Sequence, residues 1–235
     1  MTVYRDDDVI SSSVKKDGQW EAGLAGAMLA RLNAAAATAS AAQQSLCRNA
    51  DLAQRVLLLD KALGGSAAAG DCVMVSGVSN KGDGVLACNK APGWVPGPGH
   101  VVRPWRLELA RLDDLLGDCA DDIVVAKMDV EGYEAHVLEG GRGTLLDRRI
   151  PFIHSEVGPV MMAGAGSNAT AFLEAFAQAG YELRTGSWDT PRLLDPAEVV
   201  VKAAGKGLVN VCMTYNPSLD PRTPGAGGPR STSPA

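Results

Sequence analysis

The residues best placed to do chemistry lie in one acidic segment, Lys127-Met128-Asp129-Val130-Glu131-Gly132-Tyr133-Glu134. It follows a short apolar run, 123–126, that predicts a buried strand, and it leads into a helical pattern. In open α/β sheets ligands bind at the carboxyl ends of parallel strands, so Asp129 and Glu131 stand where a site is expected. Their carboxylates would orient a substrate hydroxyl or act as a general base.

The same acids have a structural alternative. A helix is predicted to begin near Tyr133, and carboxylates at the start of a helix interact favourably with its dipole. We interpret Glu134, which lies inside the first turn, in this structural way. Lys127 stands in an otherwise apolar strand, where a lysine normally needs a carboxylate partner, so we interpret it as one half of an ion pair.

A second apolar run, 151–157, predicts another strand and also carries an acid near its end, Glu156. Together with His154, Asp129 and Glu131, this acid forms the donor set of an alternative function, a metal-dependent hydrolase. The spacing of these residues matches no established ligand motif, so we predict no metal site.

The composition is that of a globular protein. The chain has 235 residues, of which 46% are apolar and 21% charged, and this favours a single domain with a sizeable core. The net charge of −5 argues against a nucleic-acid partner. No apolar run is long enough to span a bilayer, and the acidic start lacks the layout of a secretory signal. We therefore expect a soluble, intracellular chain.

The five cysteines are scattered and form no C-x-x-C pair, which excludes zinc ribbons and thioredoxin chemistry. We predict reduced, mostly buried thiols.

Apolar strands alternate with amphipathic helices along the chain, and this predicts a layered α/β domain with a largely parallel sheet. The C-terminal residues 217–235 are rich in Pro, Gly, Ser and Thr and predict a disordered tail. The expected helices are 22–48, 111–116, a helix from Tyr133, and one capped by Ser167 or Asn168 and stopped by Gly180; the expected strands are 55–59, the hairpin 72–76 with 85–88, 123–126, 151–157, 181–184 and 208–213.

Several of these features occur together, in order, in one known family. From about Asp17 to Asn216 the chain resembles the FkbM-type methyltransferases. The matching features are the Lys-x-Asp-x-Glu-Gly-x-Glu segment at 127–134, the upstream 112–116, the strand with Glu156, the opening 18–21 and the hairpin turn 80–84.

The resemblance implies a methyltransferase domain over residues 1–216 with a Rossmann-like class I sheet. It implies S-adenosylmethionine as cofactor and a hydroxyl on a small-molecule or glycan-like acceptor as the methylated group. It also implies that Asp129 and Glu131 lie at the edge of the fourth strand and Glu156 at that of the fifth, as candidate catalytic residues.

One family feature has no counterpart in the sequence. The family binds its cofactor with a strand ending in Asp-x-Gly-x-Asn-x-Gly, followed by a helix and a second strand ending in an acid. The corresponding residues 22–44 are alanine-rich and too few for such a unit, which needs roughly 30 residues or more. We therefore expect the sheet to lack its first two core strands, and we assign no cofactor-binding residues. The alternative function is a non-catalytic remnant of the fold that acts as a binding module.

Overall fold

The computed structural model describes residues 57, 59, 61–65, 72–79, 84–103, 107–117, 119 and 123–223. Contacts within the chain divide it into two units, Met1–Cys119 and Ala120–Ala235. The alanine-rich segment, where we expected the cofactor-binding strands to be missing, lies outside the described residues, as does most of the predicted strand 55–59.

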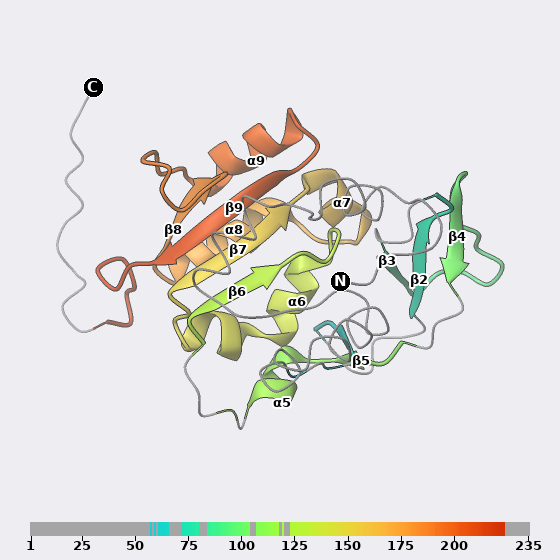
Figure 1. Ribbon diagram of the computed structural model, residues 1–235, viewed down its shortest axis with the longest axis horizontal. Coiled ribbons are helices and arrows are strands. Elements are labelled where there is room, and N and C mark those ends of the chain that lie inside the picture. The colour runs from blue at the N-terminus through green and yellow to red at the C-terminus, as the bar shows by residue number, and fades with distance from the viewer. Residues whose placement is uncertain are drawn as a thin grey trace, which may run out of the picture. The chain divides into compact units, whose positions relative to one another are not determined.

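The first unit is built around an antiparallel three-stranded sheet of order β3-β2-β4 (Figure 1). The predicted hairpin is confirmed, because β2 and β3 pair antiparallel with Val75 opposite Val85. A second, two-stranded sheet joins β1 and β5 in parallel. The elements are β1 (Ala62–Leu63), β2 (Cys72–Gly77), β3 (Val85–Cys88), β4 (His100–Arg103), β5 (Leu109–Ala110) and α5 (Leu112–Leu116).

The hairpin register overturns the prediction of reduced thiols for two of the cysteines. Cys72 and Cys88 stand directly opposite each other on β2 and β3 and are joined by a disulfide. Their separation of 16 residues carries no disulfide signal by itself. Only the pairing of the strands brings the two sulfur atoms together. Cys119 and Cys212 are not part of a disulfide, and Cys212 is buried as predicted.

The second unit contains a four-stranded sheet of order β6-β7-β9-β8 (Figure 1). The chain alternates between strands and helices, which confirms a mixed α/β fold. Its elements are β6 (Val125–Met128), α6 (Glu134–Gly140), a π-helix η1 (Gly143–Asp147), β7 (Phe152–Val157), α7 (Pro159–Gly164), α8 (Ala169–Gln178), β8 (Tyr181–Thr185), α9 (Pro196–Ala204) and β9 (Val209–Tyr215).

The expectation of a largely parallel sheet is wrong for this unit. β6 and β7 are parallel, but β9 lies between β7 and β8 and runs antiparallel to both. The strand is buried, with Val211 and Met213 fully covered. A short apolar run does not indicate whether a strand is parallel or antiparallel to its neighbours. The direction of β9 is set by the connection through α9 and not by the composition of the strand.

One face of this sheet forms the core of the unit. Ile153, Val157 and Leu183 are almost fully buried, and α8 contributes Phe172 and Phe176 to the same core. α8 packs against β8, and α9 packs against β9. Because side chains alternate along a strand, the other face receives the residues between these apolar positions.

Helix boundaries follow local capping chemistry. Asn168 caps α8 as predicted, since its Oδ1 accepts a hydrogen bond of 2.9 Å from the Ala171 N–H. The sequence analysis missed α7 and α9. α9 carries a capping box in which Asp195 and Glu198 each bond the other's backbone N–H. None of the described helices is long and apolar enough to cross a membrane.

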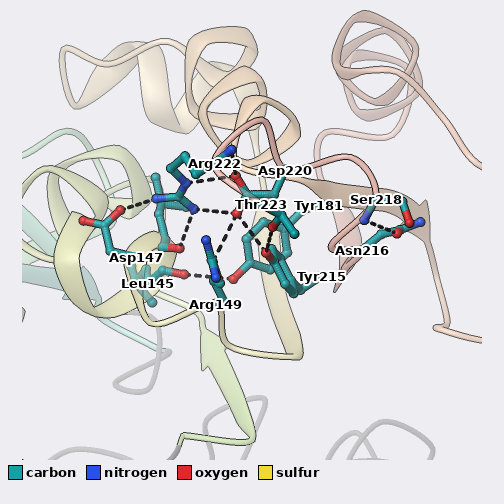
Figure 2. Close-up of polar contacts among 11 residues, drawn as sticks. Leu145, Asp147, Arg149, Tyr181, Tyr215, Asn216, Ser218, Asp220, Arg222 and Thr223 are labelled. Atoms are coloured by element: carbon teal, nitrogen blue, oxygen red, sulfur yellow. Dashed lines mark hydrogen bonds and ion pairs between the residues drawn. The ribbon is translucent and has the colours of Figure 1, made fainter. Parts of the chain in front are cut away.

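The folded part of the chain extends past the predicted start of the tail at residue 217. The Asp220 side chain is fully buried, accepts hydrogen bonds from the Tyr215 hydroxyl at 2.8 Å and Arg222 Nε at 2.9 Å, and pairs with Arg149. Figure 2 shows Arg222 between Asp220 and Asp147, to which it also bonds. These contacts tie residues 217–223 to the rest of the unit, because an unpaired buried carboxylate would be strongly unfavourable.

Candidate functional site

The pairing of β6 with β7 brings two of the predicted site residues to one edge of the sheet. Lys127 is paired with His154 and Met128 with Ser155, so Asp129 and Glu156 follow at corresponding positions. The two strands are parallel, so both acids lie at their carboxyl ends, where ligands of open α/β sheets bind. Side-chain alternation places Lys127, Asp129, His154 and Glu156 on the same face.

Asp129 is held by the lysine that precedes it by two residues. Its Oδ2 accepts a hydrogen bond of 2.8 Å from Lys127 Nζ, with the two side chains 32% and 28% exposed. The predicted ion pair is confirmed. A pair this exposed contributes only about 0–1 kcal/mol to stability. Its effect at the site is to orient the carboxylate and to balance its charge.

Glu131 and Gly132 form a tight turn between β6 and α6. Their φ angles are +53° and +92°, and the Tyr133 N–H donates to the Val130 carbonyl at 3.1 Å. Two positive φ angles in succession are those of a type I′ turn. A side chain at Gly132 would lie 2.7 Å from the backbone of Met161, so glycine is required there. Glu131 adopts a left-handed conformation that costs a non-glycine residue roughly 1–2 kcal/mol.

Glu134 has a larger role than the sequence indicated. Its side chain is buried, with 1% of the residue exposed. Oε1 accepts hydrogen bonds from the Gly132 N–H at 3.2 Å and from the Val130 N–H at 3.4 Å. Oε2 is buried and has no hydrogen-bond partner among the described residues. Burial raises the pKa of this carboxyl. Glu134 therefore bonds to the acidic turn and does more than complement a helix dipole.

His154 is a second buried polar group at this face. Among the described residues neither ring nitrogen has a partner within strict hydrogen-bond geometry, nor does the Oδ1 atom of Asn210 on β9, although Asn210 is near enough to act on the imidazole. The indole of Trp188 lies 5.9 Å from the imidazole. Burial, and then the charge of Lys127, lower the pKa of His154 to about 4, so the ring is neutral at physiological pH. The sequence analysis considered this histidine only as a metal ligand.

The metal-dependent alternative gains no support here. Among the described residues no three His, Cys, Asp or Glu side chains lie close enough together to hold a metal ion. Asp129 and Glu156 each follow directly after the last paired residues of β6 and β7, Met128 and Ser155, whereas Glu131 lies in the turn beyond β6. The signal that could have revealed Glu134 was its position two residues after the turn glycine, within reach of the turn amides.

A comparison with known protein families finds a match to part of the chain. Residues 84–183 match the methyltransferase FkbM domain. The predicted resemblance is confirmed over this range, which includes the acidic segment 127–134 and Glu156. No curated protein and no solved structure matches the chain. The FkbM match supports a methyltransferase family, so methyl transfer is the chemistry to consider for the acidic edge.

S-adenosylmethionine, the cofactor that the FkbM match implies, carries a sulfonium cation, ribose hydroxyls and a carboxylate. The carboxylates at the β6 and β7 edge suit the cation and the hydroxyls. The cofactor's own carboxylate needs a cation or free backbone N–H groups. At this edge Lys127 is bonded to Asp129, and the Gly132 N–H is bonded to Glu134. These described residues therefore do not fit the whole cofactor, and we assign none of them to hold it.

Proposed function

We propose that this chain is an FkbM-type methyltransferase that acts on a hydroxyl oxygen, and that the β6–β7 edge is its acceptor site. The observation that carries the proposal is the parallel register of β6 and β7, which brings Asp129 and Glu156 side by side within the FkbM match. β6 and β7 then correspond to the fourth and fifth strands of a class I sheet, in a domain that extends past Asn216 to include Asp220 and Arg222. S-adenosylmethionine is the proposed methyl donor.

The two carboxylates act on the acceptor hydroxyl. A carboxylate that accepts the hydroxyl's hydrogen bond fixes the direction of the oxygen lone pairs, and fixed approach geometry accounts for much of the rate of a displacement reaction. The same carboxylate is positioned to take the hydroxyl proton as it is lost. Lys127 keeps the Asp129 side chain in one orientation through their 2.8 Å bond. Glu131, at the adjacent turn, completes the acidic rim.

The acceptor class follows from this chemistry. Adjacent carboxylates accept hydrogen bonds and donate none when ionised, so they select groups that donate. A polyhydroxylated small molecule or glycan presents several hydroxyl donors at once. The acidic rim also disfavours anionic acceptors through like-charge repulsion.

Two measurements on the full chain test the proposal. Calorimetric titration with S-adenosylmethionine should give saturable binding, and tritium from the labelled methyl group should be transferred to hydroxyl-bearing acceptors. Asp129→Asn and Glu156→Gln should each lower transfer by about 10²–10⁴-fold if they act on the proton. Glu174→Gln, an exposed glutamate on α8, is the matched control and should transfer at the wild-type rate. Equal transfer by all variants would contradict the assignment of the site.

A second function is favoured by one observation. Lys127 and the Gly132 N–H are already engaged within the chain, and the sequence lacks the family's glycine-rich cofactor turn. A non-catalytic binding module would have these properties. It would bind hydroxyl-bearing ligands but not S-adenosylmethionine, so the calorimetric titration separates the two functions.

A further inference from the structure

We propose that Glu134 is the positioning residue of the acidic site: its carboxylate holds the turn that presents Asp129 and Glu131. This inference rests on the proposed function for its catalytic consequence, but its structural content can be tested without any activity. The turn is the only covalent link between the end of β6 and the start of α6, so its shape determines where both acids point.

The geometry of the carboxylate supports this role. One oxygen, Oε1, accepts from two amides of the turn, at 3.2 Å from the Gly132 N–H and 3.4 Å from the Val130 N–H. The Gly132 amide is buried together with Glu134. If the Glu134 carboxylate were removed, the buried Gly132 N–H would be left without its hydrogen bond. Leaving a buried donor unpaired costs free energy, so the turn depends on this carboxylate.

The turn needs such an external support. Glu131 has a φ of +53° although it is not glycine, and residues in this region persist only where the surrounding structure over-determines them. On the other side of the turn, Gly132 packs closely against the backbone of Met161 on α7. The turn is therefore held between a carboxylate and a helix.

The second oxygen of Glu134 distinguishes this residue from an ordinary helix cap. Oε2 is buried, and no residue in the described part of the chain hydrogen-bonds to it. Buried polar atoms without partners are rare in folded proteins, and functional sites are among the places where they occur. A cap at an exposed helix start would leave its second oxygen in water at no cost.

Amide hydrogen exchange measured by NMR on the full chain tests the proposal. In Glu134→Asp the side chain is one methylene shorter and keeps its charge, so Oε1 no longer reaches both amides. Exchange at the Gly132 N–H should then become about tenfold faster, which is the effect of losing one hydrogen bond in a local opening. In Glu134→Gln the amide oxygen can take the place of Oε1, and exchange should stay within about threefold of wild type.

Glu139→Gln on the same helix is the matched control, because its side chain is 66% exposed, and it should leave exchange at Gly132 unchanged. Exchange at Val211 and Met213 of β9 reports whether each variant remains folded. Wild-type exchange at Gly132 in Glu134→Asp would overturn the proposal, as would equally fast exchange in Glu134→Asp and Glu134→Gln.

The catalytic consequence is read separately. In a chain that transfers methyl groups, Glu134→Asp should lower kcat with little change in the KM for S-adenosylmethionine, and Glu134→Gln should restore much of kcat. A loss of folded protein would instead lower the active concentration of both variants. If no form of the chain binds S-adenosylmethionine, the proposed function fails, while the exchange result still decides the role of Glu134.

Discussion

At the scale of single residues, the four carboxylates of the acidic segment and of β7 differ in their surroundings. Asp129 is balanced by Lys127 and partly exposed, whereas Glu134 is buried with one unpartnered oxygen. Environment, and not residue type, therefore separates a group that meets solvent or substrate from one that holds the backbone.

The raised pKa of Glu134 predicts how stability depends on pH. The folded state favours the protonated form, so this residue's contribution is most favourable below its ordinary pKa of 4.5 and is lost as the pH rises through the raised value. Glu134→Gln cannot ionise, so its stability relative to wild type should increase between pH 4.5 and pH 8. Urea unfolding at the two pH values measures this difference. A difference that does not change with pH would contradict the raised pKa of the buried Glu134 carboxyl.

The turn glycine gives a second prediction at this scale. Gly132→Ala introduces a methyl group 2.7 Å from the Met161 backbone and strains a φ of +92°, so it should destabilise the chain by roughly 2–4 kcal/mol. Gly166→Ala is the matched control, because Gly166 has a φ of +80° but open space around its Cα. It should cost about 1 kcal/mol, the conformational part alone. Chemical denaturation measures the loss of unfolding free energy in both variants. Equal losses would mean that the Met161 backbone moves away to accommodate the new methyl group.

At the scale of elements, short-range pairing decides which residues become neighbours. Pairing of β2 with β3 places Cys72 opposite Cys88, where they form a disulfide. The parallel pairing of β6 with β7 places Asp129 and Glu156 at corresponding positions after the two strands. Disulfides persist mainly in oxidising compartments. The Cys72–Cys88 bond therefore counts against the expectation of an intracellular chain.

Removal of the disulfide should weaken the first unit. The bond closes a loop of 16 residues, and a loop of this length corresponds to about 3 kcal/mol of stabilisation in the chain-entropy model. Cys72→Ser with Cys88→Ser should lower the denaturation midpoint of the unit by a matching amount, whereas Cys119→Ser should not. Peptide mapping without reductant should recover the 72–88 cross-link. Free thiols at both positions in protein purified without reductant would contradict the bond.

At the scale of the whole chain, residues beyond β9 complete the second unit. Asp220 is buried between Arg222, Arg149 and the Tyr215 hydroxyl (Figure 2). The hydrogen bond from Arg222 holds the pKa of Asp220 far below its usual value. Residues 217–223, which composition assigned to a tail, therefore contribute to folding.

This network predicts an acid-dependent loss of stability. Because the folded pKa of Asp220 is depressed, its contribution is present above the ordinary pKa of 3.8 and declines as the pH falls below it. Asp220→Asn should lower the thermal midpoint at pH 7, and its difference from wild type should shrink in strong acid. Asp189→Asn, at an exposed aspartate, is the control at pH 7 and should have the wild-type thermal midpoint there. Truncation after Asn216, which removes Asp220 and Arg222, should lower the thermal midpoint at pH 7.

The sequence by itself determined the features that depend on local chemistry. Turn residues and apolar alternation predicted the β2–β3 hairpin, β7 and β8, and Asn168 predicted the start of α8. The acidic segment was recognised because its residue types follow a buried strand and match a family pattern. These features need only neighbours within a few positions, so periodicity and capping are sufficient to find them.

Only the tertiary structure decided the features that depend on distant partners. They include the antiparallel direction of β9, the pairing of Cys72 with Cys88, and the burial of Asp220 beside two arginines. The two hydrogen bonds that Glu134 accepts from the acidic turn belong with these features. They require both the left-handed turn and the packing of α7 behind it. Burial and partner identity set the energies of such groups, and neither can be read from a residue's place in the chain.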